Sequence, residues 1–464
     1  MSVKAFIHRG PFGASGFVRG LGTVQGTAGK VGRLAGRMWG EVKGPLYRNA
    51  LFLMLSSVIG AALGFFFLLV VTRVYADTDV GAALTLISTI GFLAAVATLG
   101  FGIGLIRFLP GTADRPALVN ESLSIAGVLA LVLALVFALG VNVWAPTLDF
   151  ILETPIYVVL IAITAMGYAF APILDTAAVA ARRADLSTWR VTIFSVLKVP
   201  MPLLLVPFLS GRLGIYMAWS IALGISVLIA GFVFTPRAIA GYRPRPRFRG
   251  VEVRPIFAFS LGNWVASVIG VAATLLLPLL VTNTLGVAQA AYFWVAFSVA
   301  SILFVIPGAT TTSLLAEASQ ANARRRRDER RAILFSFALL VPGILGVEIL
   351  AAPILSLFGP PEYVAAGVEP VRILALASIP IFLSGLLGTR IRIRKKVWPL
   401  IAAVVVETSV VLGLGYVLLE NLEVGLPGLA WAFVLGSTAQ VPILFAAARG
   451  PIEIEEIEPA PVPP

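Results

Sequence analysis

The sequence consists of long uninterrupted runs of apolar residues separated by short charged segments. Each run holds about 20 residues, which is enough for a helix to cross the ~30 Å hydrocarbon core of a bilayer. Only 12% of the residues are charged, whereas a soluble domain carries about 25%. A soluble globular protein is therefore excluded. Continuous rather than alternating apolar residues also exclude a membrane β-barrel. We therefore predict an all-α polytopic membrane protein.

The apolar runs predict twelve transmembrane helices. Their ranges are 50–72, 81–106, 120–143, 156–181, 190–209, 213–235, 256–282, 289–316, 332–354, 370–389, 399–418 and 426–447. Cytoplasmic loops carry an excess of Lys and Arg, and every second loop here is basic. Outside those basic loops, only Arg73, Arg212, Arg372 and Lys198 remain of the 35 Lys and Arg residues. This alternation predicts a plasma or inner membrane protein with both termini in the cytoplasm.

The two halves of the membrane region resemble each other. An SVIG sequence begins at Ser57 in the first helix and again at Ser267 in the seventh helix. Each half holds six helices, so both halves have the same orientation, and such repeats are related by an axis along the membrane normal. We predict an N-terminal lobe over residues 49–235 and a C-terminal lobe over residues 255–448, arranged as two pseudo-symmetric six-helix bundles.

Three charged segments flank or connect the predicted lobes. Residues 1–48 form a basic leader that we expect to be disordered, with either Met1 or Met38 as the start of the protein. Residues 236–254 form a basic cytoplasmic connector, and residues 449–464 form an acidic, Pro-rich tail. Basic segments beside a membrane attract anionic lipids. We therefore expect membrane lipids as partners, expect no nucleic acid, and allow for docking of cytoplasmic glycosyltransferases.

The residue types in the chain argue against enzymatic chemistry. There is no cysteine and only one histidine, His8, so a thiolate metal site or a histidine triad is excluded. No nucleotide-binding GxxxxGK[ST] motif occurs. We expect no catalytic residue, no metal and no cofactor. A membrane glycan polymerase or ligase remains an alternative of another class, but it would need a large outer loop with catalytic side chains.

Several stretches in both halves carry a family resemblance. They are RNALFLMLSSVIGAALGFFFLLVVTRVY, GFLAAVATLGFGIGLIRFLPG and YFWVAFSVASILFVIPGATTTSLLAEAS. They resemble Wzx-type polysaccharide flippases of the multidrug/oligosaccharidyl-lipid/polysaccharide exporter superfamily, over residues 45–447. The resemblance implies two lobes around a cavity. It also implies that undecaprenyl-diphosphate-linked oligosaccharide units move from the inner to the outer leaflet by alternating access, for cell-surface polysaccharide biosynthesis.

A related class of the superfamily supplies the alternative function. Proton-coupled multidrug exporters often carry an acidic residue in the first helix, and residues 50–72 contain none. The resemblance therefore favours the flippase. A cation-coupled multidrug or metabolite antiporter of the same superfamily remains the alternative.

Two charges in the predicted helices lie at matching depths. A charge inside a bilayer costs at least ~2.5 kcal/mol on insertion scales, so it should line a cavity or have a partner. Pairing Trp189 with Trp398 places Lys198 opposite Glu407. Two interpretations stay open. In one, Lys198 binds the diphosphate and Glu407 binds a coupling cation, and in the other the two side chains form an ion pair across the lobes.

The other candidates for ion coupling or gating lie nearer the helix ends or beside other charges. Arg107 and Glu317 are at predicted cytoplasmic helix ends, where they either close a gate or extend to the interface. Asp175 either couples transport to cations or neutralises a basic neighbour. Glu348 lies in the outer part of the ninth helix and is a further candidate for ion coupling.

Two outer arginines complete the candidate site. Arg73 and Arg372 lie near the predicted outer surface. They either attract the diphosphate as it leaves or anchor their helices at the interface.

Overall fold

The computed structural model describes residues 45–153, 155–209, 211–249, 253–318, 325–393 and 397–449, without the side chains of 45–51, 309–318, 325–332, 335 and 393. Every regular element in these residues is helical, which confirms the all-α prediction. Residues 1–44 of the predicted leader, which include both candidate start sites, and residues 450–464 of the predicted tail lie outside the described residues. Residues 45–48, which were assigned to the leader, form the start of α2 (Pro45–Val74).

The first half of the chain forms the N-terminal lobe. Its helices are α2 (Pro45–Val74), α3 (Asp77–Ala97), α4 (Phe101–Phe108), α5 (Arg115–Leu139), α6 (Val141–Trp144), α7 (Phe150–Glu153), α8 (Pro155–Ala180), α9 (Ala184–Lys198), α10 (Met201–Leu205), α11 (Gly211–Ile229) and α12 (Thr235–Ala238). A π-helical segment, Ala230–Phe234, joins α11 to α12.

The second half forms the C-terminal lobe. Its helices are α13 (Arg254–Leu275), α14 (Leu277–Leu285), α15 (Val287–Ala318), α16 (Arg325–Leu355), α17 (Pro361–Leu376), α18 (Ser378–Ile393), α19 (Trp398–Ser409) and α20 (Leu426–Ala448). Two π-helical segments, Val410–Leu414 and Val417–Asn421, follow α19.

Eleven helical segments of the described chain are long and apolar enough to cross a membrane. The fifth predicted crossing is divided into α9 and α10. Pro200 and Pro202 cause this division, because proline removes a helical hydrogen bond and clashes with the preceding turn. Together α9 and α10 supply one more crossing, so the structure is consistent with twelve and describes a multi-pass membrane protein.

Several predicted helix ranges differ from the structure. The tenth begins at Pro361 rather than at residue 370 and is divided at Ala377 into α17 and α18. The fifth helix begins at Ala184 rather than at residue 190, so Arg190 lies inside α9 and not in a loop. The second predicted span breaks between α3 and α4, where Leu99 has φ 48° and Gly100 has φ 72°. A Cβ on Gly100 would lie 2.8 Å from Cβ of Trp264 on α13. The break therefore allows the two lobes to approach closely.

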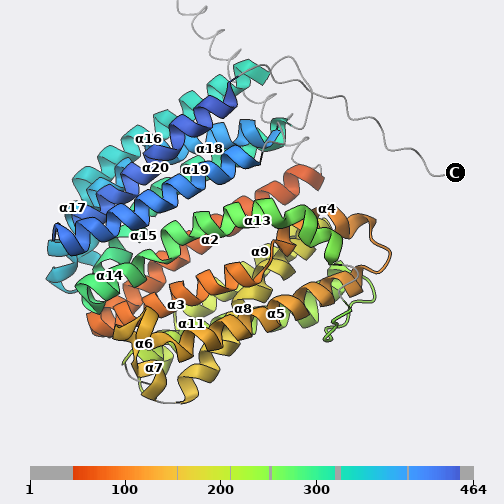
Figure 1. The fold of residues 1–464 in the computed structure, drawn as a ribbon, viewed down its shortest axis with the longest axis horizontal. Helices are drawn as coiled ribbons and strands as arrows, with labels where there is room; N and C mark the ends of the chain where they lie inside the picture. The colour runs from red at the N-terminus through yellow and green to blue at the C-terminus, as the bar shows by residue number, and fades with distance from the viewer. Residues whose placement is uncertain are drawn as a thin grey trace, which may run out of the picture.

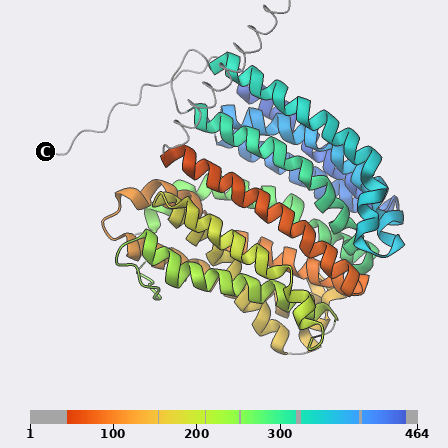
Figure 2. The same ribbon diagram turned by 180° about the vertical axis from the view of Figure 1, so that it is seen from behind.

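The two lobes lie side by side and meet along α3 (Figures 1 and 2). This helix packs against α13, α14 and α15 of the other lobe, and α4 packs against α13. The hydroxyl groups of Thr85 and Thr282 lie 2.8 Å apart across this contact. A Cβ on Gly81 would lie only 1.7 Å from the carbonyl oxygen of Val287, so glycine is required there.

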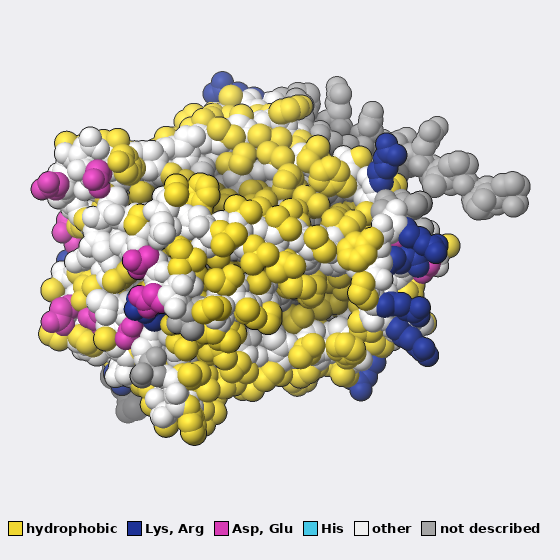
Figure 3. Space-filling view, turned by 60° about the horizontal axis from the view of Figure 1, so that its bottom comes forward, with side chains coloured by type: hydrophobic (Ala, Val, Ile, Leu, Met, Phe, Trp, Pro, Cys, Tyr) yellow, Lys and Arg dark blue, Asp and Glu magenta, His cyan; other side chains and the backbone are white. Residues whose placement is uncertain are grey.

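Charged side chains gather at the two ends of the helices, with a hydrophobic belt between them (Figure 3). The basic end carries Arg107 in the last turn of α4 and the arginines of the connector between α12 and α13. The acidic end carries Asp77 and Asp79 at the start of α3. Because cytoplasmic loops are rich in Lys and Arg, this separation of charge predicts that the basic end faces the cytoplasm.

Candidate functional site

The C-terminal lobe contains a cavity of about 1020 Å³, called the C-lobe cavity below. Helices α13, α18, α19 and α20 line it, together with Ile103 and Arg107 of α4. It extends from Arg107 and Arg392, near the basic end, to Glu407 on α19. Glu407 is nine residues beyond the start of α19, which is about 14 Å along the helix. The cavity is large enough for an organic substrate.

Small side chains create this cavity. Residues that contribute little volume recur on the facing sides of α13, α18 and α19: Ala266, Ser267, Gly270, Ser384, Gly385, Gly388 and Ala403. Spacings of three and four residues put such side chains on one face of a helix. The helices therefore pack without filling the space between them.

Glu407 gives the C-lobe cavity a negative charge inside the hydrophobic belt. The hydroxyl of Ser437 donates a hydrogen bond of 3.3 Å to its Oε1, and Gln440 also lines the cavity. Among the described residues, no Lys or Arg forms an ion pair with this carboxylate. A carboxylate without a counter-ion at membrane depth favours binding of a proton or a cation.

Lys198 has quite different surroundings. It is the last residue of α9, is 4% exposed, and lies outside the C-lobe cavity. Its Nζ is 4.8 Å from the ring centroid of Trp219 and 4.9 Å from that of Phe194, within the range of cation–π interactions. No ion pair joins it to Glu407 in the described part of the chain. Lys198 is therefore enclosed by aromatic rings of its own lobe.

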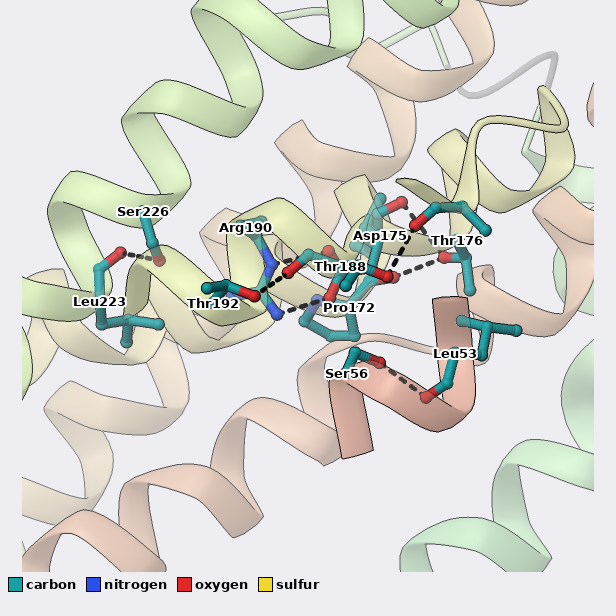
Figure 4. Close-up of polar contacts among 12 residues, drawn as sticks. Leu53, Ser56, Pro172, Asp175, Thr176, Thr188, Arg190, Thr192, Leu223 and Ser226 are labelled. Atoms are coloured by element: carbon teal, nitrogen blue, oxygen red, sulfur yellow. Dashed lines mark hydrogen bonds and ion pairs between the residues drawn. The ribbon is translucent and has the colours of Figure 1, made fainter. Parts of the chain in front are cut away.

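Asp175 and Arg190 form an ion pair inside the N-terminal lobe (Figure 4). Nε of Arg190 donates to Oδ1 of Asp175 at 2.6 Å, and Nη2 donates to Oδ2 at 2.5 Å. The pair borders a smaller pocket of about 290 Å³ between α3, α8, α9 and α11. Asp175 thus neutralises a basic neighbour, and that neighbour is Arg190 on the next helix.

Arg107 and Arg73 lie at opposite ends of the lobe contact. The Arg107 guanidinium lies 4.5 Å from the ring centroid of Phe259 on α13, at the mouth of the C-lobe cavity. Nε of Arg73 donates a 2.7 Å hydrogen bond to the carbonyl of Leu357 in the other lobe. Glu317 falls within α15, but its side chain lies outside the described residues.

Arg372 and Glu348 form an exposed local pair. Nε of Arg372 is 3.6 Å from Oε2 of Glu348 and donates to its carbonyl oxygen at 3.0 Å. The side chains are 47% and 35% exposed. They join α17 to α16, and neither residue lines the C-lobe cavity.

Five polar residues of the cavity wall were not predicted as site residues. They are Asn263, Ser267, Ser384, Arg392 and Gln440. The recurring small and polar residues on α13 and α18 were the signal that was available. In a membrane helix the same pattern also marks close helix packing, so it does not by itself distinguish a cavity wall from a contact.

Comparisons with known proteins identify the fold. No protein-family profile matches the sequence, and no curated protein matches it. Among solved structures, an inward-facing multidrug resistance MATE family transporter of the MOP superfamily aligns with a TM-score of 0.61 at 15% identity, over 85% of this chain and 97% of that one. The chain has the fold of these transporters.

Two other structures sharpen the comparison. A MOP superfamily transporter from Pyrococcus furiosus, described as having reversed polarity in its binding pocket, aligns with a TM-score of 0.62 at 15% identity, over 87% of this chain and 94% of that one. An outward-facing MATE family transporter aligns with a TM-score of 0.53 at 15% identity, over the same shares of the chains. Both alignments show the same two-lobe fold.

Proposed function

We propose that this protein is a secondary transporter that carries an organic solute across the membrane by alternating access, coupled to a cation. One observation carries the proposal. A cavity of about 1020 Å³ leads from the basic end of a two-lobe transporter fold to an acidic side chain without a counter-ion, Glu407. The MATE-like fold supports this antiporter function over the flippase that the sequence resemblance favours.

The lobe contacts explain how access alternates. At the acidic end, the hydroxyl of Tyr292 on α15 donates a 2.7 Å hydrogen bond to Asp77 on α3. Arg73 and Thr85 also bond to the other lobe near this end. These contacts close the acidic end while the C-lobe cavity is accessible from the basic end. Transport then requires the lobes to rotate, breaking these contacts and exposing the cavity on the other side.

Glu407 couples the two halves of the cycle. In the state with the cavity open to the outside, the carboxylate takes up a proton or metal cation. In the state described here, binding of the solute displaces that cation toward the cytoplasm. A ligand shifts the equilibrium between the two lobe arrangements only by the difference in its affinity for them. Because the cation and the solute exclude each other at the Glu407 carboxylate, each passage carries one or the other, and the protein exchanges them.

A second candidate function is flipping of lipid-linked oligosaccharide. Arg107 and Arg392 at the mouth of the C-lobe cavity favour it, because guanidinium groups bind phosphate oxygens in bidentate fashion. In this mechanism the undecaprenyl chain stays in the bilayer while the diphosphate and sugars pass through the cavity. Cytoplasmic glycosyltransferases would then supply the substrate at the basic end.

Reconstituted proteoliposomes distinguish the two functions. One arm measures gradient-driven accumulation of a fluorescent organic cation, and the other measures flipping of a fluorescent undecaprenyl-diphosphate oligosaccharide. We expect accumulation in the first arm, its loss with Glu407→Gln, and no loss with Glu420→Gln, which removes an exposed carboxylate at the acidic end. Flipping that is lost with Arg107→Gln and Arg392→Gln, without accumulation of the cation, would reject the antiporter.

A further inference from the structure

A further cavity lies in the N-terminal lobe and shares no lining residue with the C-lobe cavity. It has a volume of about 350 Å³ and lies between α5, α8, α11 and residues 242–249 of the connector. We call it the connector crevice. Its inner walls include Leu123, Met166 and Phe170, so its interior is apolar.

The connector crevice opens into the hydrophobic belt rather than into water. Val128 on α5, Leu228 on α11 and Phe232 in the π-helical segment that follows α11 line it and are themselves exposed. Large exposed apolar side chains at this depth face lipid in a membrane protein. An occupant that enters between them therefore comes from the bilayer.

A glycine keeps the crevice open. Gly231 lies in the π-helical segment Ala230–Phe234, and a Cβ built on it would meet no atom within 4 Å. At the opposite wall, a Cβ on Gly127 would lie 2.7 Å from the Phe170 ring, so α5 and α8 are already in contact there. The free volume is thus bounded on one side by tight packing and on the other by Gly231.

Hydrogen bonds hold the connector in place at the basic end of the crevice. Nδ2 of Asn120 donates to the carbonyl of Arg243 at 2.9 Å, and the backbone N–H of Arg247 donates to Ser124 at 2.9 Å. The side chain of Arg247 also bonds to Glu121, with Nε 3.0 Å from its carboxylate. The connector is therefore an ordered wall of the crevice.

The connector also presents positive charge beside the crevice. Arg245 lines the crevice, and the side chains of Arg243, Arg245 and Arg249 are exposed and form no ion pair within the described ranges. The carboxylates of Glu121 and Asp114 are bound to Arg247.

An unsatisfied hydroxyl adds an independent indication of a ligand. Tyr242 lines the crevice and is 3% exposed, and its hydroxyl has no hydrogen-bond partner in the described chain. Burial raises the pKa of Tyr242 to about 12, so the hydroxyl remains a donor at neutral pH. Buried polar groups are nearly always hydrogen-bonded, and an acceptor in the crevice would satisfy this one.

We propose that the connector crevice binds an anionic phospholipid of the membrane. An acyl chain occupies the apolar interior, the phosphate lies against Arg243 and Arg245, and an ester oxygen accepts the Tyr242 hydroxyl. The apolar interior and the opening in the hydrophobic belt favour a lipid over free phosphate, and the arginines favour an anionic headgroup over a zwitterionic one. This inference is independent of the substrate that the protein transports.

Filling the crevice tests where the acyl chain binds. Gly231→Leu places a side chain in open space and replaces glycine with a better helix former. Gly224→Leu is the matched control, because Gly224 lies on α11, also meets no atom within 4 Å, and does not line the crevice. The affinity for phosphatidylglycerol is measured by native mass spectrometry of the full-length protein in detergent.

We expect Gly231→Leu to weaken phosphatidylglycerol binding roughly tenfold, because each displaced methylene contributes a factor of about four. Gly224→Leu should bind like the wild type. Unchanged binding in Gly231→Leu, or equal losses in both variants, would overturn the assignment of the acyl chain to this crevice.

Changing the charge tests the headgroup and remains informative if Gly231→Leu does not fold. The double variant Arg243→Gln/Arg245→Gln should lose the preference for phosphatidylglycerol over phosphatidylcholine. The control Arg115→Gln/Arg182→Gln removes two other exposed arginines at the basic end and should keep it. Equal wild-type affinity for the two lipids, or displacement of the lipid by millimolar inorganic phosphate, would overturn the proposal of an anionic lipid.

Discussion

The predicted repeat pairs position 198 with position 407, but the surroundings of the two charges are opposite. Lys198 in the N-terminal lobe is enclosed by Trp219 and Phe194 and does not line the C-lobe cavity. Glu407 in the C-terminal lobe lines a cavity of about 1020 Å³. The sequence pairing predicts a similar depth for both charges, and the neighbouring side chains decide which of them lines the C-lobe cavity.

One pair of equivalent residues accounts for much of the difference. The offset that relates Lys198 to Glu407 also relates Phe194 to Ala403. Phe194 places a ring against the lysine, whereas Ala403 is part of the C-lobe cavity wall. Phe194 thus contributes to the enclosure of the lysine, whereas the small residue paired with it borders open cavity volume. Under the proposed function, the C-terminal lobe is the one that binds the solute.

The largest effect is expected from making the C-terminal lobe resemble the N-terminal lobe. Ala403→Phe introduces the ring that fills the equivalent position, so the C-lobe cavity loses volume beside Glu407. We expect transport in proteoliposomes to fall to the level of empty liposomes. The control is Ala402→Phe, since Ala402 is exposed and does not line the cavity. Full transport by Ala403→Phe would mean that this cavity is not the transport route.

The next largest effect is expected from breaking an ion pair, and each lobe offers one pair for comparison. Asp175 and Arg190 have side chains only 19% and 9% exposed. Arg190→Gln leaves a carboxylate unpaired in the lobe interior, which should destabilise the protein by about 3 kcal/mol. Arg372→Gln breaks the exposed pair with Glu348 and should cost about 1 kcal/mol or less. Thermal unfolding in detergent measures both, and equal losses would contradict this contrast.

The smallest effect is expected at Lys198. Lys198→Met keeps an extended side chain among the rings and removes a charge that has no carboxylate partner in the described chain. Loss of the cation–π contacts, about 1–2 kcal/mol, is offset by removal of a buried charge, so stability should change little. Transport should stay within about twofold. A stable Lys198→Met variant that no longer transports would show that the N-terminal lobe also binds the solute.

The sequence predicted the architecture well, because its main signals are local. Long apolar runs depend on neighbouring residues alone, and the all-α fold follows from them. The break in the fifth helix at Pro200 could also be read locally, but the predicted span ran through it. The start of α9 was misplaced because Arg190 looked like a loop residue, whereas its charge is balanced by Asp175 on another helix.

The candidate site was predicted less completely, because a cavity depends on side chains that are absent. Glu407 was identified as an isolated charge in an apolar helix, and the structure places it in the C-lobe cavity. The sequence around Lys198 did not show that this side chain is enclosed, because the enclosure also requires Trp219 from a separate helix. Arg392 looked like one more arginine of a basic loop, and only the packing of α18 against α19 and α13 brings it to the cavity.

The most direct test of the account compares two transport modes of Glu407→Gln in the same proteoliposomes. Solute exchange without an ion gradient requires binding and rotation of the lobes, whereas uphill accumulation also requires coupling through the carboxylate. We expect Glu407→Gln to retain exchange and to lose accumulation driven by a proton or sodium gradient. Accumulation that persists in the variant at the wild-type level would contradict the central claim that Glu407 couples transport to a cation.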